Sequence, residues 1–221
     1  MKTVGVIGIG LMGMGVAKRL LEQGFRVRVR DIRSEAEDEA RAAGAEVCAT
    51  LAELARECDA LITLVVDADQ TEAVVFGAKG AAETLSEGAV LMMCSTVAPA
   101  YTASLGERLA ARGLAMLDAP VSGGPARAHA GTMSMMLGGT AATLAICEPL
   151  LAAMSDKRFH VGEAIGDGSK AKIVNNLLAA GCEALALAKR LGLDARRMLD
   201  VIAQSSGASW IVEDRMRRAP R

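Results

Sequence analysis

Short apolar runs alternate with stretches of helical periodicity along most of this chain. Residues 3–7 are apolar and β-branched, as in a strand buried on both faces, and from Met14 apolar residues recur at helical spacing until Gln23-Gly24 provides a stop. Residues 25–31 alternate strictly between apolar and polar side chains, which predicts a second strand. The same patterns predict further strands at 46–49, 59–67, 89–94, 114–117, 133–137 and 158–161, and helices at 34–43 (capped by Ser34), 50–58 (capped by Thr50), 67–76, 100–112 and 141–154.

This repeated alternation predicts an α/β fold: a Rossmann-type, doubly wound, mostly parallel sheet with right-handed crossovers, followed by a truncated all-α segment. The alternation stops after Val161, and an uninterrupted helical pattern runs from Ser169 towards Leu191, with another helix after it. We therefore expect two domains, a Rossmann domain over residues 1–163 and a partial helical domain over 164–221 that begins with a long interdomain helix.

The run Gly8-Ile9-Gly10-Leu11-Met12-Gly13 closes the first predicted strand and opens the first helix. Such a turn points backbone N–H groups and the positive end of a helix at whatever lies above it, so the pyrophosphate of a dinucleotide is the first candidate. A bare G-x-G-x-x-G is a weak signal, but Asp31 ends the second strand at about the 20-residue interval at which a carboxylate reaches a ribose 2′-hydroxyl. A carboxylate that only caps the strand is the alternative. Arg30 and Arg33 could instead accommodate a 2′-phosphate, but we expect NAD because Asp31 would repel that phosphate.

Other predicted strand ends also carry candidate ligand contacts, because ligands of such sheets bind at the carboxyl ends of the strands. Val65-Val66-Asp67 would pass near the adenine ribose and phosphates, and Thr96 offers a hydroxyl on the nicotinamide side, although such hydroxyls are more often turn formers. Ser122-Gly123-Gly124 exposes consecutive backbone N–H groups, which suits a carboxylate. Lys172 and Asn176 are four residues apart on one helix face, where a snorkelling surface lysine is the alternative.

Charge and composition narrow the class of protein. The balance of 25 Lys+Arg against 26 Asp+Glu gives a formal net charge of −1, which provides no global attraction to nucleic acid or to anionic membranes. The five cysteines are scattered without C-x-x-C spacing, so we expect a reduced, cytoplasmic chain without a structural metal. The sequence offers no apolar run of the ~18 residues that a membrane span needs. The basic residues at 215–221 are interpreted as a solvated helix end and not as a nucleic-acid site.

Three ordered motifs resemble the β-hydroxyacid dehydrogenase family. They are the turn from Gly8 to Gly13, the loop Asp118-Ala119-Pro120-Val121-Ser122-Gly123-Gly124 with Ala130-Gly131-Thr132, and Gly166-x-Gly168-x-x-x-Lys172-x-x-Asn175-Asn176. The family includes 3-hydroxyisobutyrate dehydrogenase, tartronate semialdehyde reductase and the sheet domain of 6-phosphogluconate dehydrogenase. Within it, the chain looks most like the L-threonate dehydrogenases in Leu64-Val65-Val66, Gln70-Thr71-Glu72 and Ser206-Gly207-Ala208-Ser209-Trp210.

The resemblance implies a catalytic lysine, a substrate site and a dinucleotide site. The lysine is Lys172, with Asn176, and Asn175 beside it, as the amide that orients the substrate. The loop Ser122, Gly123 and Gly124 would bind the substrate carboxylate. The cofactor residues implied are Gly8, Ile9, Gly10, Leu11, Met12, Gly13, Asp31, Arg33, Val65, Val66, Asp67 and Thr96.

The implied activity is hydride transfer between NAD, or less favourably NADP, and a small β-hydroxy acid such as 3-hydroxyisobutyrate, L-threonate or the acid related to tartronate semialdehyde. A neutral lysine can take the proton released when the alcohol is oxidised. The positive nicotinamide ring disfavours the charged lysine, so we expect a lowered pKa for Lys172.

The helical part differs from the family pattern in two respects. Family members continue for several more helices, which include a downstream lysine near the cofactor, and the stretch between Asn176 and Glu183 looks about two helical turns too short. We expect a homodimer or homotetramer in which another subunit covers the apolar helix faces. A truncated dinucleotide-binding protein or pseudoenzyme with little turnover is the alternative function.

Overall fold

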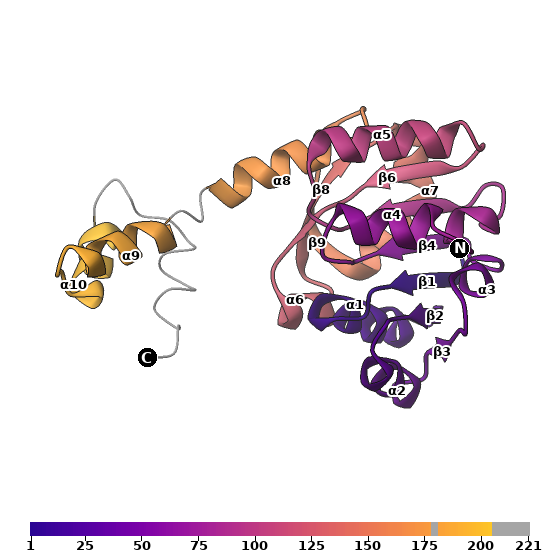
Figure 1. Ribbon diagram of the computed structural model, residues 1–221, viewed down its shortest axis with the longest axis horizontal. Coiled ribbons are helices and arrows are strands. Elements are labelled where there is room, and N and C mark those ends of the chain that lie inside the picture. Colours follow the sequence, from indigo (N-terminus) through magenta and orange to yellow (C-terminus); the bar gives the residue numbers. More distant parts are fainter. Residues whose placement is uncertain (178–180, 205–221) are drawn as a thin grey trace. The chain divides into compact units, whose positions relative to one another are not determined.

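The computed structural model describes residues 1–177 and 181–204 (Figure 1). It consists of two compact units, Met1–Lys172 and Ile173–Arg221. The first unit contains the sheet, and the described part of the second is helical. The predicted α/β class followed by a helical segment is therefore confirmed.

The sheet of the first unit has the strand order β3-β2-β1-β4-β5-β6-β8-β7, and β9 pairs with β8. Pairing is parallel from β3 through to β6, as a Rossmann-type fold requires. Beyond β6 the direction changes, because β8 runs antiparallel to both β6 and β7, and β9 runs parallel to β8. The strands are β1 (Thr3–Ile7), β2 (Arg26–Arg30), β3 (Glu46–Val47), β4 (Ala60–Thr63), β5 (Val90–Met93), β6 (Ala115–Asp118), β7 (Val121–Ser122), β8 (Met133–Gly138) and β9 (Ser155–Gly162).

Helices cover both faces of this sheet, so successive residues of the central strands enter different cores. Ile62 of β4 belongs to the core beneath α1, α2, α6 and α7, while its neighbour Leu61 belongs to the core beneath α3, α4, α5 and η1. The β-branched and apolar strand patterns follow directly from this double burial. The elements are α1 (Leu11–Glu22), α2 (Ser34–Ala42), α3 (Leu51–Ala55), α4 (Ala68–Phe76), η1 (Ala81–Glu83), α5 (Pro99–Ala110), α6 (Pro125–Ala130), α7 (Ala141–Met154) and α8 (Asp167–Leu177).

Some predicted boundaries were wrong, for local reasons. The strand predicted at 59–67 ends at Thr63, in register with the last residues of its partners, Ile7 of β1 and Met93 of β5. Ser34 is the first helical residue of α2 and Arg33 takes the cap position. Thr50 does cap α3, accepting the N–H of Glu53. Three elements were not predicted, namely β7, α6 and η1, and β9 is longer than the strand expected there.

The second unit contains α9 (Gly181–Arg190) and α10 (Ala195–Ala203). The Asp194 side chain caps α10 by accepting the N–H of Arg197 at 2.9 Å, and Leu199 is buried against Leu185 and Ile202. The helix predicted from Ser169 towards Leu191 is described on both sides of residues 178–180. Those three residues and 205–221, including the Ser206–Trp210 motif, lie outside the described residues.

Arg28 is a charged residue of β2 that is buried and forms hydrogen bonds with its guanidinium group. It occupies a polar position in the alternating pattern of β2, yet only 4% of it is exposed. Its Nη1 donates to the carbonyls of Glu53 (2.8 Å) and Leu54 (3.1 Å), and its Nε donates to Glu46 Oε1 at 3.0 Å. The guanidinium thus provides a donor to the Glu53 carbonyl at the end of α3, and a second donor to the Leu54 carbonyl, which also accepts Cys58 Sγ at 2.9 Å.

We expect Arg28→Met to lower the free energy of unfolding by about 1–3 kcal/mol, because it leaves the Glu53 carbonyl without its donor and removes the Arg28 bonds to Leu54 and Glu46. The matched control is Arg26→Met on the same strand, whose side chain also pairs with Glu46 but is 55% exposed. That variant should cost less than about 1 kcal/mol. Urea denaturation of both variants measures the difference, and equal costs would contradict the role given to Arg28.

Candidate functional site

The glycine turn is built on a close approach between β1 and α1. Gly8 follows β1 with φ +84°, and a Cβ atom on it would lie 2.8 Å from the carbonyl oxygen of Leu64. A Cβ atom on Gly13 would lie 2.0 Å from the carbonyl oxygen of Gly8. A larger residue at Gly13 requires the helix to move away from the strand, and one at Gly8 meets both a disfavoured φ and the segment that follows β4.

Gly10 occupies the N-cap position of α1, and within the described part of the chain no side chain caps this helix. The N–H groups of its first turn, on Leu11, Met12 and Gly13, therefore face the space beyond the helix end. The side chain of Leu11 is itself exposed, so Leu11 contributes here through its backbone. Free N–H groups and the positive helix end together make an anion site.

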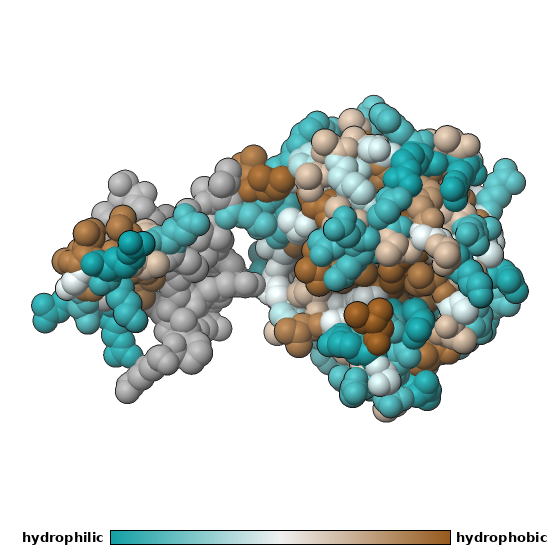
Figure 2. Space-filling view, in the orientation of Figure 1, coloured by the Kyte–Doolittle hydropathy of each residue, from teal (hydrophilic) through white to brown (hydrophobic). Residues whose placement is uncertain are grey.

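A cleft of about 590 Å³ lies beside this turn. It brings together six of the residues singled out from the sequence, Gly8, Gly10, Asp31, Arg33, Val65 and Val66. Figure 2 shows apolar side chains reaching the surface between α4 and α1, in the region that these residues border. Arg30, considered above as a 2′-phosphate contact, also lines the cleft, as do seven residues that were not predicted as ligand contacts, Ile7, Ile32, Leu51, Leu64, Gln70, Ala73 and Val74.

The missed residues differ in how visible they were in the sequence. Ile32 directly follows Asp31 in the sequence, but its exposure as an apolar residue is evident only in the structure. The residues from α3 and α4, such as Leu51 and Val74, reach the cleft only because those helices pack over this end of the sheet, and sequence spacing carries no sign of that.

Other candidate residues do not line this cleft. Ile9 is buried and acts through its backbone N–H. Asp67 caps α4 by accepting the N–H of Gln70 at 2.8 Å, and the Gln70 side chain in turn accepts the N–H of Val66 at 3.0 Å. Thr96 follows β5 at the same edge of the sheet and is exposed.

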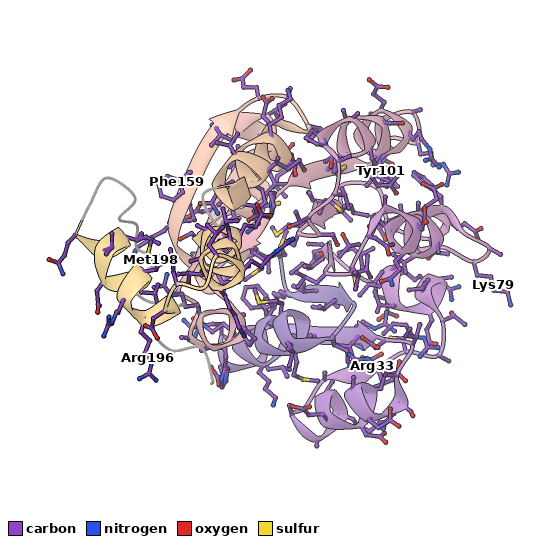
Figure 3. The ribbon with its side chains drawn as sticks, turned by 60° about the vertical axis from the view of Figure 1, so that its left-hand side comes forward. Arg33, Lys79, Tyr101, Phe159, Arg196 and Met198 are labelled. Carbon is purple, nitrogen blue, oxygen red and sulfur yellow. The ribbon has the colours of Figure 1, made fainter. Side chains whose placement is uncertain are left out.

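Asp31, at the end of β2, is held by several donors. Its Oδ2 accepts the N–H of Ile9 at 2.8 Å, and its Oδ1 accepts the N–H of Arg33 at 3.0 Å and Arg33 Nε at 3.1 Å. Arg33 lies at the start of α2 (Figure 3). Burial raises the pKa of Asp31, but the hydrogen bonds from Arg33 and Ile9 outweigh burial and leave this pKa below its ordinary value. The group is therefore a carboxylate at neutral pH.

The loop after β6 contains two glycines in backbone conformations that other residues disfavour. Ser122 pairs across from Ser134 in the β7–β8 ladder. Gly123 and Gly124 follow with φ of +145° and +79°, values that side chains disfavour. A Cβ atom on Gly123 would also lie 2.9 Å from the side chain of Arg127, so both glycines are required by the loop.

Lys172 lies on α8 and is 8% exposed. The helix begins at the carboxyl edge of the sheet, because a Cβ atom on Gly168 would lie 2.6 Å from the carbonyl oxygen of Met136 and 2.8 Å from that of Asp118. Lys172 follows one turn later. Asn175 and Asn176 continue the same helix within the second unit.

Neither a metal cluster nor a membrane span is found in the described residues. Residues 1–177 and 181–204 contain no group of three or more His, Cys, Asp or Glu side chains placed to hold a metal ion. The helices of the same ranges include none long and apolar enough to cross a membrane.

Two family models match consecutive parts of the chain. Residues 3–162 match the NAD binding domain of 6-phosphogluconate dehydrogenase, and residues 166–221 match the NAD-binding domain of NADP-dependent 3-hydroxyisobutyrate dehydrogenase. The chain belongs to the β-hydroxyacid dehydrogenase family. As a member, it is an oxidoreductase of the class that acts on a CH–OH group, and the resemblance seen in the sequence is confirmed.

Individual relatives of this dehydrogenase agree. It is 48% identical to an L-threonate dehydrogenase of Cupriavidus necator, over 97% of this chain and 74% of that one, and 41% identical to one of Haemophilus influenzae. A 3-hydroxyisobutyrate dehydrogenase structure from Salmonella typhimurium matches with a TM-score of 0.85 at 36% identity, covering 98% of this chain and 78% of that one. Another, from Mycobacterium tuberculosis with L-serine, matches with a TM-score of 0.84 at 30% identity, covering 100% and 76%.

The lowered pKa of Asp31 makes a pH-dependent contribution to stability. We expect Asp31→Asn to be less stable than the parent dehydrogenase at neutral pH, because it loses the charge-assisted bonds from Arg33 and Ile9. The stability difference between Asp31→Asn and the parent should have its full size above about 3.9, the ordinary pKa of Asp. It should vanish as the pH falls through the lowered pKa of the folded state, because the parent side chain is then protonated and uncharged.

Urea denaturation from about pH 7 down to about pH 3 measures this difference. Asp69→Asn, at an exposed carboxylate on α4, is the control. A stability gap between Asp31→Asn and the parent that stays constant across this range would refute the linkage.

Proposed function

We propose that this dehydrogenase transfers a hydride between a small β-hydroxy acid and NAD, with Lys172 as general acid/base. The observation that carries the proposal is that two parts of the candidate site lie at the same edge of the sheet. The glycine turn after β1 and the start of α8 beside Asp118 both lie at the carboxyl edge of the parallel sheet, where such folds bind ligands. The names of the relatives favour an L-threonate-like acid over one like 3-hydroxyisobutyrate or the acid related to tartronate semialdehyde.

The residues of the first unit fit a dinucleotide. Among the described residues, only Arg33 comes within 4 Å of where a Cβ atom on Gly10 would lie, so the backbone there is open to a phosphate. The α1 N–H groups would hold the pyrophosphate and Asp31 the adenosine ribose, with Val65, Val66, Asp67 and Thr96 near further parts. The bound nicotinamide supplies the hydride acceptor or donor.

The reaction also needs a group that transfers a proton and groups that bind and orient the substrate. The backbone N–H groups of Ser122, Gly123 and Gly124 would bind the substrate carboxylate. The neutral amine of Lys172 would take the hydroxyl proton during oxidation and return it during reduction. Burial distinguishes Lys172 from a snorkelling surface lysine, because only 8% of the residue is exposed. Asn175 and Asn176 would orient the substrate by amide hydrogen bonds.

The domain division and the assembly are part of the same proposal. Residues 1–163 would form the dinucleotide-binding domain, and 164–221 would begin the helical substrate and dimerisation domain. The two family models, which meet between residues 162 and 166, support this division. We further propose a cytoplasmic homodimer or homotetramer. The alternative function, a dinucleotide-binding protein with little turnover, stands if the parent binds NAD but converts none of a panel of hydroxy acids.

We expect tighter binding of NAD than of NADP, because Asp31 repels a 2′-phosphate. Asp31→Ser should weaken NAD binding at least about tenfold, the size of one charge-assisted hydrogen bond. Asp38→Ser is the control and should leave NAD affinity unchanged, because this carboxylate of α2 is 71% exposed and does not line the cleft. Calorimetric titration gives all three affinities, and a parent that prefers NADP would overturn the assignment.

We expect Lys172→Ala to reduce kcat by about 10² to 10⁴, the usual contribution of a general acid/base, and to leave NAD affinity unchanged. Lys170→Ala is the matched control, because that lysine is 65% exposed and pairs with Asp167 on the same helix. Absorbance of the reduced nicotinamide with L-threonate and 3-hydroxyisobutyrate measures turnover. A near-parental kcat in Lys172→Ala would refute the role of the lysine.

A further inference from the structure

Asp118 is a fully buried carboxylate that the mechanism above does not use. It ends β6 and accepts three hydrogen bonds, all from the start of α8. Its Oδ2 accepts the N–H groups of Gly166 (3.0 Å) and Ser169 (2.8 Å), and its Oδ1 accepts Ser169 Oγ at 2.9 Å. A carboxylate from a distant strand therefore takes the place of a local N-cap for this helix.

The contacts around this carboxylate fix the first turn of α8 from several sides. Gly168 packs against the backbone of β6 and β8 more closely than any Cβ atom would allow. The buried hydroxyl of Ser169 also lies 3.0 Å from Thr102 Oγ1 of α5. The helix start is thus tied to two strands and to a helix of the sheet domain.

Asp118 also begins the loop that leads to Ser122, Gly123 and Gly124. The same residue therefore stands at the origin of the proposed carboxylate site and holds the helix on which Lys172 follows one turn later. A displacement of about 1 Å between reacting groups is enough to cost about 10²-fold in rate.

We infer that Asp118 is a positioning residue, which sets Lys172 relative to the Ser122–Gly124 loop by clamping the first turn of α8 to the end of β6. The inference rests on the proposed function, because it assigns Asp118 its effect through Lys172.

The conservative variant Asp118→Asn separates the effect of the hydrogen bonds at this position from the effect of the negative charge. In Asp118→Asn the amide oxygen can accept the same two backbone N–H groups. The amide nitrogen can donate a hydrogen bond to Ser169 Oγ, whose own O–H can then donate to Thr102 Oγ1. Asp118→Ala removes all three bonds. A positioning role therefore predicts loss in Asp118→Ala and rescue in Asp118→Asn.

We expect Asp118→Ala to lower kcat about tenfold to hundredfold with L-threonate and NAD, and to change the KM for the acid and the Kd for NAD less than about threefold. Asp118→Asn should keep kcat within about threefold of the parent. Amide hydrogen exchange of Gly166 and Ser169 should be faster than in the parent for Asp118→Ala only. Asp167→Ala, at a more exposed carboxylate in the first turn of the same helix, is the control and should leave kcat within about threefold.

Two results overturn the inference while the proposed function stands. They are a parental kcat in Asp118→Ala, and an equal loss of kcat in Asp118→Asn and Asp118→Ala, each with Lys172→Ala inactive. An active Lys172→Ala variant refutes the proposed function and the inference with it. If Asp118→Ala fails to fold or to bind NAD, Ser169→Ala replaces it. This variant removes the hydroxyl bonds to Asp118 and Thr102 and keeps both backbone N–H bonds to Asp118. It should lose kcat about threefold to tenfold with NAD affinity unchanged, and an unchanged kcat contradicts the clamp.

Discussion

A Cβ atom on Gly13 would lie 2.0 Å from the carbonyl oxygen of Gly8, so β1 and α1 meet backbone to backbone. This contact aims the uncapped start of α1 along the carboxyl edge of the sheet, and it places the N–H of Ile9 within 2.8 Å of Asp31 on the neighbouring strand. The open start of α1 and the bond between Ile9 and Asp31 therefore both depend on this contact. Enlarging Gly13 would separate the helix from the strand and disturb both features together.

The same device occurs a second time, where Gly168 brings the start of α8 against the backbone of Asp118 and Met136. In the sheet order, β1 and β6 are separated by β4 and β5, so the two helix starts lie roughly 14 Å apart along the edge at about 4.8 Å per strand. One end of the edge carries the glycine turn and Asp31, and the other carries the Ser122–Gly124 loop and Lys172. A ligand extended along the edge would meet both.

The sequence predicted what depends on local pattern and missed what depends on packing between distant segments. The central strands, the family and the Thr50 cap were recognisable, because double burial, motif spacing and capping leave direct marks on neighbouring residues. The early end of β4 depends on where its partner strands stop, and the burial of Arg28 depends on the carbonyls of α3. Asp118 was quoted only as the start of a motif, since its partners Gly166 and Ser169 lie 48 and 51 residues later.

Asp31 and Asp118 illustrate two uses of a carboxylate at one sheet edge. Both accept backbone N–H groups, yet the pKa of Asp31 is lowered while that of Asp118 is raised. Burial raises the pKa of each group. At Asp31 the Arg33 cation and the hydrogen bonds lower the pKa by more than burial raises it. The neutral donors around Asp118 do not offset burial, and the nearby charge of Asp167 raises the pKa of Asp118 further. Asp31 lines the cleft and can exchange partners with a ligand hydroxyl, but Asp118 is sealed from solvent and from ligands. Its hydrogen bonds can therefore act on the reaction only by holding the helix that carries Lys172.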